Sequence, residues 1–412
     1  MTNNNRLDAL LALRGFACFM VVIFHCEPPR DAIIYKGHDL SWLIFSHGMV
    51  AVWIFFVLSG YLIGKVFYTK RYNPNVSGTI NFWRNRAIRI FPLYYFAVLI
   101  LTVLVYPDWL KTENWGYLIR VCTFTYDGSP QLQSSLNFNG VFWSLSTEVQ
   151  FYLVIPFIYS FFQDKLSNKK QVLLAGGSII ILTLIIRSFF WITFRSEMSE
   201  KFSYAFKYWY APLITNFDLF LCGFLVNAWL QHQYQIYQPK ILKRLKIPTL
   251  FKKQIAVILI VIMYFFTAHH IYNQELWSLK ERAGSGLRTT TTIFILPVVT
   301  ALITSFFIWV FEKDSYYCFT KNEKLSFSSI LINPIRILEV FGNLSYGVYI
   351  WHQPIIEKMK PIFTSEIPIE AFYARFTATL ILSIFLASAT YYFVELPSSK
   401  WKISRQTEKS TR

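Results

Sequence analysis

The chain has 412 residues, of which 54% are hydrophobic, 19% aromatic and only 15% charged. A soluble globular protein carries roughly 25% charged residues, so this composition excludes an ordinary soluble domain and indicates a membrane protein. In a soluble chain the formal net charge of +17 would suggest nucleic acid. Here the positive charges lie between apolar runs, as in loops that meet anionic lipid, so we expect a lipid bilayer as partner and no nucleic acid.

Apolar runs long enough to cross a bilayer, about 17 to 25 residues, recur along the whole chain. They predict an all-α membrane protein of about ten transmembrane helices, at residues 9–26, 48–65, 91–107, 141–162, 171–191, 209–230, 254–270, 290–311, 337–357 and 371–394. The segments on one side carry roughly twice as many Lys and Arg as those on the other, and positive segments stay cytoplasmic. Both termini are therefore expected in the cytoplasm.

The chain is predicted to form a single transmembrane domain, 1–412, with a core at about 6–397 and a basic cytoplasmic tail at 398–412. A cleavable signal is not expected, because Arg14 lies where a signal core would be apolar. The five cysteines are scattered and show no metal-binding spacing. Motifs for nucleotides, zinc or a serine nucleophile are absent, so no metal is expected.

An arginine and a histidine lie in or at the end of the first apolar run, LLALRGFACFMVVIFHC. An ionisable group in a lipid-facing segment is costly, so function is its default interpretation. Arg14 and His25 would lie within about 20° of the same helix face and about 16 Å apart along the axis. The alternative is a snorkelling arginine and a structural interfacial histidine. The pair predicts a permanent cation at depth and a titratable imidazole toward the outer side.

Three arginines lie close together in NFWRNRAIRIFPLYY, without an acidic residue nearby. Arg86 and Arg89 are i, i+3 neighbours on one helix face, with Arg84 just outside it. The predicted topology puts them on the cytoplasmic side, as it does Arg14. Because planar guanidinium groups fit phosphate oxygens, the cluster is a candidate site for a multiply charged anion. A cytoplasmic positive anchor is the alternative, which spacing alone does not separate from it.

A carboxylate, Glu148, lies about two turns into the fourth apolar run, in NGVFWSLSTEVQFYLVIPFI. That helix enters from the outer side, so we expect Glu148 at about the depth of His25. A carboxylate can fix the tautomer of an imidazole and raise its basicity, and the imidazole then accepts a hydroxyl proton. We therefore predict His25 and Glu148 as the catalytic base and its orienting residue. The alternative is a structural ion pair of Glu148 with Arg187 or Arg375.

The remaining histidines favour a structural or interfacial role, and among them His352, in LSYGVYIWHQPII, stays a second candidate for catalysis. Together the polar residues predict a cationic inner site for a phosphorylated donor and an outer site that activates a hydroxyl. Coenzyme A has the shape that links the two sites, with phosphates at one end and a thioester at the tip of its pantetheine arm. Acyl-CoA is accordingly the expected donor substrate.

These motifs, in this order, resemble those of acyltransferase family 3, the multi-pass membrane O-acyltransferases that modify bacterial glycans and some small molecules. The resemblance covers nearly the whole chain and is carried by RLDALLALRGFACFMVVIFH, GMVAVWIFFVLSGYLIG, RNRAIRIFPLYY, FWSLSTEVQFYLVIPF, LSYGVYIWHQPII and YYFVELP. It implies acetyl-CoA as the usual donor and an ester on a sugar hydroxyl as the usual product. It also implies the cytoplasmic (inner) membrane as the usual location.

The resemblance further implies roles for single residues. Arg14 and His25 match the arginine and histidine of the family's first helix, which are regarded as essential. Arg86 and Arg89 match an RxxR pair thought to face the acyl-CoA, and Glu148 matches the acidic residue of the fourth helix.

Two departures from the family pattern matter. The segment ITNFDLFLCGFLV has Asn216 near a place where the family often has an arginine. Many relatives carry an additional extracytoplasmic esterase-like domain. This chain is expected to have no such soluble domain attached, and to deliver the acyl group itself or hand it to a separate protein.

The sequence thus predicts a membrane O-acyltransferase that transfers acetyl from acetyl-CoA to a hydroxyl of a surface glycan or lipid-linked saccharide. In this scheme Arg14, Arg86 and Arg89 hold the CoA phosphates. His25 deprotonates the acceptor and Glu148 orients His25. The alternatives are a transporter or flippase for a lipid-linked sugar, an acyltransferase with another acyl group or a small-molecule acceptor, and a scaffold subunit. The sequence does not encode the oligomeric state, the acceptor, or the choice between direct transfer and an acyl-enzyme.

Overall fold

The computed structural model describes residues 7–128, 139–200, 202–236, 249–273, 290–313 and 327–401. Within these ranges the fold is helical, and the strands are those of one small antiparallel hairpin, β1 Ile34–Tyr35 with β2 His38–Asp39. The predicted all-α class is therefore confirmed for this part of the chain. Residues 402–412 of the predicted basic tail lie outside the described ranges.

The long helices follow the predicted runs in chain order. They are α1 Ala9–His25, α2 Gly48–Tyr68, α3 Val76–Ile100, α5 Phe142–Phe162, α6 Lys169–Glu200, α8 Phe217–Ile236, α9 Thr249–Tyr272, α11 Leu296–Glu312, α13 Ile337–Met359 and α14 Pro368–Thr390. The short helices are α4 Trp115–Cys122, α7 Phe202–Ala205, α12 Phe327–Ile332 and α15 Leu396–Ser399. Single π-helical turns stand at Leu101–Val105, Phe206–Tyr210, Thr291–Ile295 and Tyr391–Glu395. Short 3₁₀ turns stand at Ser41–Ile44, Pro107–Leu110, Thr112–Asn114, Leu213–Asn216 and Pro334–Arg336.

Eight helical segments of the described residues are long and apolar enough to cross a membrane, and they contain α2, α3, α5, α6, α8, α9, α11 and α14. The other two predicted runs are also helices, but they fall short of this standard. α1 is a shorter apolar helix of 17 residues. α13 is long enough, but polar residues such as Asn343, His352 and Gln353 lower its mean hydropathy.

The third predicted run is only the second half of its helix. α3 begins at Val76, and the side chain of Asn75 caps it by accepting a hydrogen bond from the backbone N–H of Gly78 at 2.7 Å. Arg86 and Arg89 therefore lie on a helix, as predicted, and Arg84, which was expected just outside it, lies on the same helix. The predicted membrane run did not include the polar first half of α3, because the run was defined by apolar residues. Helix formation needs only backbone hydrogen bonds and side chains of adequate helix propensity.

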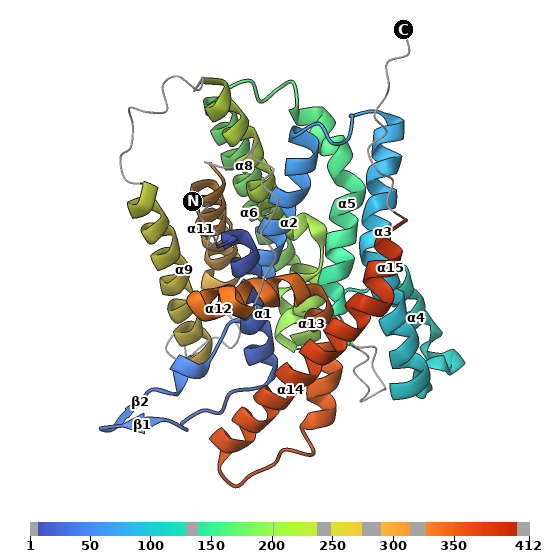
Figure 1. The fold of residues 1–412 in the computed structure, drawn as a ribbon, viewed down its shortest axis with the longest axis vertical. Coiled ribbons are helices and arrows are strands. Elements are labelled where there is room, and N and C mark those ends of the chain that lie inside the picture. Colours follow the sequence, from blue (N-terminus) through green and yellow to red (C-terminus); the bar gives the residue numbers. More distant parts are fainter. Residues whose placement is uncertain are drawn as a thin grey trace.

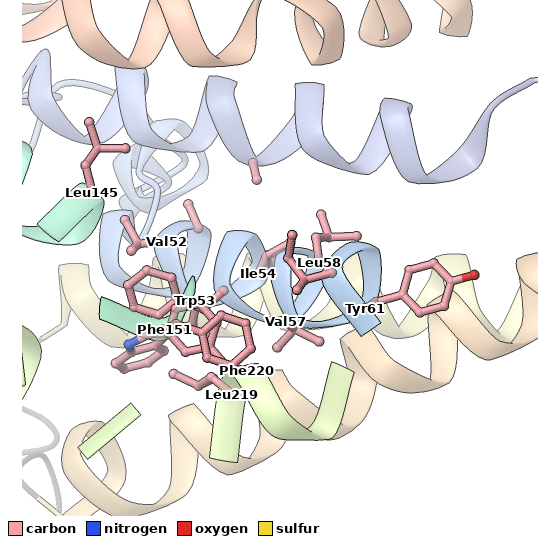
Figure 2. Packing of buried hydrophobic residues seen from close by; sticks show 14 of the residues in the cluster. Val52, Trp53, Ile54, Val57, Leu58, Tyr61, Leu145, Phe151, Leu219 and Phe220 are labelled. Carbon is pink, nitrogen blue, oxygen red and sulfur yellow. The ribbon is translucent and has the colours of Figure 1, made fainter. Parts of the chain in front are cut away.

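The central helices are packed on all sides and the outer ones are not. The apolar windows of α2 and α8 are 78% buried, whereas those of α6 and α14 are 17% and 22% buried. In Figure 1, α1 and α2 lie between α9 and α11 on one side and α3 and α5 on the other. Figure 2 shows Trp53 of α2 beside the rings of Phe151 and Phe220, with Val57 next along the same helix. The exposed apolar faces of α6 and α14 are what a lipid environment would cover.

Two reciprocal glycine contacts set the distance between α1 and α13. A Cβ atom on Gly15 would lie 2.0 Å from the backbone oxygen of Leu338, and a Cβ atom on Gly342 would lie 2.0 Å from the backbone oxygen of Leu11. Small residues allow the backbones of two membrane helices to touch in this way. The crossing fixes the polar face of α13 beside α1.

Candidate active site

Four of the five predicted site residues line one cavity of about 150 Å³, between α1, α2, α3, α5 and α13. We call it the arginine cavity. Its polar lining consists of Arg14, Ser59, Arg86, Arg89, Ser144, Glu148, Tyr152, Ser345, Tyr346 and Tyr349. The structure thus brings three guanidinium groups from two helices together, although Arg14 and Arg89 are 75 residues apart in the chain.

The three arginines differ in how far their donors are used within the described residues. Arg14 Nη2 donates to Ser345 Oγ at 3.2 Å. Arg89 Nη1 forms an ion pair with Glu395 Oε2 at 3.2 Å. The Nε atom of Arg86 is buried and has no hydrogen-bond partner among the described residues. A buried N–H without an acceptor is costly, so this cavity is suited to a ligand that carries anionic oxygens.

Glu148 lies in the arginine cavity and not beside His25, which corrects the predicted pairing. Its Oε1 atom accepts hydrogen bonds from Ser59 Oγ at 2.7 Å and from the hydroxyl of Tyr152. The expected equal depth was wrong because His25 is the last residue of α1, whereas Glu148 is six residues, or about 9 Å, into α5. Among the described residues, the contacts of Glu148 go to α2 and α5.

The predicted structural alternative for Glu148 is also not what the structure contains. Arg187 pairs with Asp218, with Nη2 and Oδ1 2.7 Å apart, and both side chains are buried. Arg375 donates from Nη2 to the backbone oxygen of Cys26 at 3.3 Å. Both arginines therefore have other partners. Arg375 holds the end of α1 directly after His25.

His25 lines a second cavity, of about 290 Å³, which we call the histidine cavity. Aromatic rings, three glycines and one amide make up most of its wall, in a lining of Phe24, His25, Gly48, Met49, Val52, Tyr126, Gly128, Gly140, Val141, Trp143, Phe206, Tyr349 and Gln353. An apolar, aromatic cavity with a few convergent polar groups is the usual form of a small-molecule or sugar site.

The two cavities meet at two residues. Val52 and Tyr349 line both of them, and we call this pair the shared wall. The hydroxyl of Tyr349 lies 2.6 Å from Ser144 Oγ of α5. The arginine cavity and the histidine cavity therefore adjoin each other at this pair of residues.

The polar side chain that contacts the His25 ring is a second histidine. His25 Nδ1 lies 3.1 Å from the backbone oxygen of Val21 and 3.1 Å from Nε2 of His352. His352 is buried, and its Nδ1 lies 3.1 Å from the backbone oxygen of Val348. The sequence analysis kept His352 only as a second candidate and did not place it beside His25.

A sequence signal for this face of α13 exists. Ser345, Tyr349 and His352 are spaced i, i+4 and i+7, which is one face of a helix. Ser345 contacts Arg14, Tyr349 belongs to the shared wall, and His352 contacts His25. The pattern could have identified a polar helix face, but not the helix that it meets. Within the described residues, no group of three or more His, Cys, Asp or Glu could hold a metal ion.

Comparisons with known proteins agree with the motifs. Residues 7–392 match the family described as an acyltransferase domain. The O-acetyltransferase OatA of Staphylococcus aureus is 23% identical over 431 residues, which cover 96% of this chain and 57% of that protein. The peptidoglycan O-acetyltransferase OatA of Listeria monocytogenes is 25% identical over 405 residues, which cover 94% of this chain and 55% of that protein. No solved structure shows a significant match.

The chain spans a little more than half the length of these relatives. The family match, by contrast, covers almost all of the chain, and it includes each predicted site residue. The helices that are apolar enough to cross a membrane also fall almost entirely within it. The chain is therefore a multi-pass membrane protein that belongs to acyltransferase family 3.

Proposed function

We propose that the protein is a membrane O-acetyltransferase, and that it transfers acetyl from acetyl-CoA to a hydroxyl of a cell-surface glycan or lipid-linked saccharide. The observation that carries the proposal is the pair of cavities. One presents three arginines, the other presents His25, and Val52 and Tyr349 line both of them. The names of the relatives, O-acetyltransferase and peptidoglycan O-acetyltransferase, support the acetyl group and the glycan acceptor.

The arginine cavity is the proposed donor site. Arg14, Arg86 and Arg89 hold the phosphate groups of coenzyme A, since guanidinium forks bind phosphate in a bidentate way. The buried Nε of Arg86 supports this role, because an anionic oxygen would satisfy it. Glu148 keeps the hydroxyls of Ser59 and Tyr152 in place and so shapes the cavity.

The histidine cavity is the proposed acceptor site. A backbone oxygen only accepts hydrogen bonds, so the contact with Val21 requires the proton of neutral His25 to lie on Nδ1. Nε2 then carries the free lone pair of the ring. His25 uses this nitrogen to accept the proton of the acceptor hydroxyl. The rings of Tyr126 and Trp143 offer apolar faces to a sugar.

The reaction needs no further reagent. As Nε2 of His25 takes the hydroxyl proton, the acceptor oxygen bonds to the carbonyl carbon of the thioester. The carbon–sulfur bond then breaks, and the leaving thiolate takes the proton back from His25. The products are the acetyl ester and free coenzyme A, and His25 is neutral again. Transfer is direct in this scheme, and it takes place at the shared wall.

The proposed location is the cytoplasmic membrane, with both termini in the cytoplasm. In that orientation α1 runs outward from Ala9, so the arginine cavity lies nearer the cytoplasm than the histidine cavity. This order suits a cytoplasmic donor and an acceptor at or beyond the midplane of the bilayer.

The first experiment compares surface glycans from cells that express the wild type, His25→Ala or His38→Ala at equal membrane levels. His38 lies in the exposed hairpin and is the matched control. We expect an acetyl-sized, alkali-removable mass with the wild type and with His38→Ala, and its loss with His25→Ala, measured by mass spectrometry. An acetyl mass that is unchanged in His25→Ala would remove His25 from the mechanism, and a transporter would leave no ester at all.

The second experiment titrates the purified protein with coenzyme A. Arg86→Ala and Arg89→Ala each remove charge-assisted hydrogen bonds, so we expect Kd to rise by roughly 10- to 100-fold. Arg84→Ala is the matched control, because Arg84 is exposed on the same helix and does not line the cavity. Equal affinity in all four proteins would be incompatible with the proposed phosphate site.

A further inference from the structure

We propose that His352 is the positioning residue for His25: it fixes the tautomer and the orientation of the base through a hydrogen bond between the two rings. This inference rests on the proposed role of His25 as the base. It replaces the predicted role of Glu148, whose contacts lie in the other cavity. The observation behind it is the distance of 3.1 Å between His352 Nε2 and His25 Nδ1.

The three hydrogen-bond contacts of the two rings have one consistent assignment of protons. His352 Nδ1 faces the backbone oxygen of Val348, so the proton of neutral His352 lies on Nδ1 and its Nε2 is an acceptor. His25 Nδ1 faces the backbone oxygen of Val21 and the Nε2 of His352, and both of these are acceptors. The N–H of His25 Nδ1 therefore donates to both, which leaves Nε2 unprotonated on a residue that lines the histidine cavity.

The opposite assignment sets lone pairs of the rings against lone pairs of the backbone oxygens. If His352 carried a proton on Nε2 and donated it to His25 Nδ1, then His25 Nδ1 would be bare and the oxygen of Val21 would face a lone pair. The proton of neutral His25 would then lie on Nε2, and this nitrogen could not accept a second proton from a hydroxyl. The contacts with the two backbone oxygens thus select the tautomer that a base requires.

His352 is held firmly enough to act in this way. Its side chain is 0% exposed, and α13 is fixed to α1 by the contact of Gly342 with Leu11. On the other side of the contact, Arg375 binds the backbone oxygens of Cys26 and Glu27 at 3.3 and 3.5 Å. The two rings therefore belong to helices whose relative position is set by backbone contacts.

A neutral orienting residue suits this place in the fold. When His25 accepts the hydroxyl proton it becomes an imidazolium, and its Nδ1–H bond to His352 Nε2 becomes charge-assisted and stronger. A carboxylate would stabilise the imidazolium more, but a buried carboxylate beside an uncharged ring carries a desolvation penalty in the resting enzyme. His352 carries no such penalty at rest, and it stabilises the imidazolium of His25 during the reaction.

The test measures the tautomer of His25 directly, by ¹⁵N NMR of histidine-labelled protein in lipid vesicles. The signals of His25 are assigned as those lost in His25→Gln. We expect a protonated Nδ1 and a bare Nε2 in the wild type. His352→Leu keeps a comparable volume and removes the acceptor, so the His25 signals should shift to a mixture of tautomers. His352→Gln offers an amide oxygen to His25 Nδ1 and should restore part of the wild-type pattern.

Activity provides the second readout. We expect kcat to fall by roughly 10- to 100-fold in His352→Leu, as for other outer partners of a functional histidine, with the KM for the donor unchanged and partial recovery in His352→Gln. If His352→Leu does not fold, then His352→Gln and the wild-type spectrum carry the test. Two results would overturn the inference: a protonated Nε2 of His25 in the wild type, or a His25 spectrum and a kcat that are the same in His352→Leu as in the wild type. Failure of the proposed function is a different result, since the tautomer is read without any transfer.

Discussion

Tyr349 is one of the two residues that line both cavities, and it is the aromatic member of the shared wall. Its hydroxyl is held by Ser144 Oγ at 2.6 Å and lies 3.4 Å from the backbone oxygen of Val141. The other member of the wall, Val52, is much smaller. Tyr349 is therefore the larger of the two shared side chains and the one to test in the proposed mechanism.

We predict that Tyr349→Ala uncouples the reaction. Loss of the ring joins the two cavities, so water from the histidine cavity reaches the thioester, and hydrolysis of acetyl-CoA should rise relative to transfer by about tenfold or more, which corresponds to 1.4 kcal/mol. The measurement is free coenzyme A released per ester formed. Tyr349→Phe keeps the ring and loses only the hydroxyl contacts with Ser144 and Val141, so its ratio should stay near that of the wild type. An equal ratio of free coenzyme A to ester in all three proteins would show that the Tyr349 ring does not keep water from the thioester.

At the level of elements, the crossing of α1 and α13 does more than join two helices. It brings Ser345 to Arg14 in one cavity and His352 to His25 in the other. The crossing depends on Gly15 and Gly342, because backbone atoms of the partner helix occupy the space that a side chain would need. A change in this crossing should therefore disturb both cavities together.

We predict that Gly15→Ala lowers both stability and transfer. The added Cβ would lie 2.0 Å from the oxygen of Leu338, and overpacking of this kind destabilises by about 1–3 kcal/mol. Gly177→Ala is the matched control, because Gly177 lies in α6 with nothing within 4 Å of its Cβ position. It should be neutral, or stabilising by up to about 1 kcal/mol, since alanine favours a helix.

The measurement is the melting temperature in detergent together with the rate of ester formation. A Gly15→Ala protein that melts and reacts like the wild type would show that α1 and α13 do not cross as described. A similar loss in Gly177→Ala would show that helical glycines in this fold matter for another reason.

The buried ion pair of Arg187 and Asp218 has a structural role between two helices. It joins the middle of α6 to the first turn of α8, and Arg187 Nε also donates to the backbone oxygen of Thr215 at 2.9 Å. The neighbouring Asn216 donates to the backbone oxygens of Tyr210 and Pro212 at 2.8 and 2.9 Å. These contacts hold the turn before α8. Asn216, where the family often has an arginine, therefore contributes to local structure and not to either cavity.

At the scale of the whole molecule, the order of the cavities across the membrane decides which side supplies each substrate. His25 is the last residue of α1, and the connection that follows it carries the exposed hairpin. The short connection after α5 lies at the other end of the helices, since α5 runs antiparallel to α13 with Asn139 beside Ile350. The two connections should therefore lie on opposite sides of a bilayer.

We predict that His38→Cys is labelled from outside intact cells, whereas Asp164→Cys is labelled only after the membrane is opened. Both positions are exposed. The measurement uses a membrane-impermeant maleimide on a chain whose five native cysteines are replaced. The distribution of Lys and Arg predicts which of the two connections is cytoplasmic. The reverse pattern would invert the proposed orientation, and labelling of both positions from one side would contradict the antiparallel arrangement.

The class of the protein, its helical runs and most of the candidate residues could be predicted from the sequence. These are local properties: an apolar run of sufficient length must hide its backbone polar groups in a helix, and an arginine within such a run stands out without any knowledge of its neighbours. Arg14, Arg86 and Arg89 were predicted to serve one ligand, and the structure does place them in one cavity.

Only the tertiary structure decided which polar residues meet. Glu148 and His25 were expected at one depth, but α5 begins near the level of Tyr349 and carries Glu148 deeper, to the arginines. His352 reached His25 instead, because Gly15 and Gly342 let α13 lie against α1. The contact depends on the relative height and rotation of helices distant in sequence. These are set by backbone contacts between them, and the periodicity of one helix contains no information about the other.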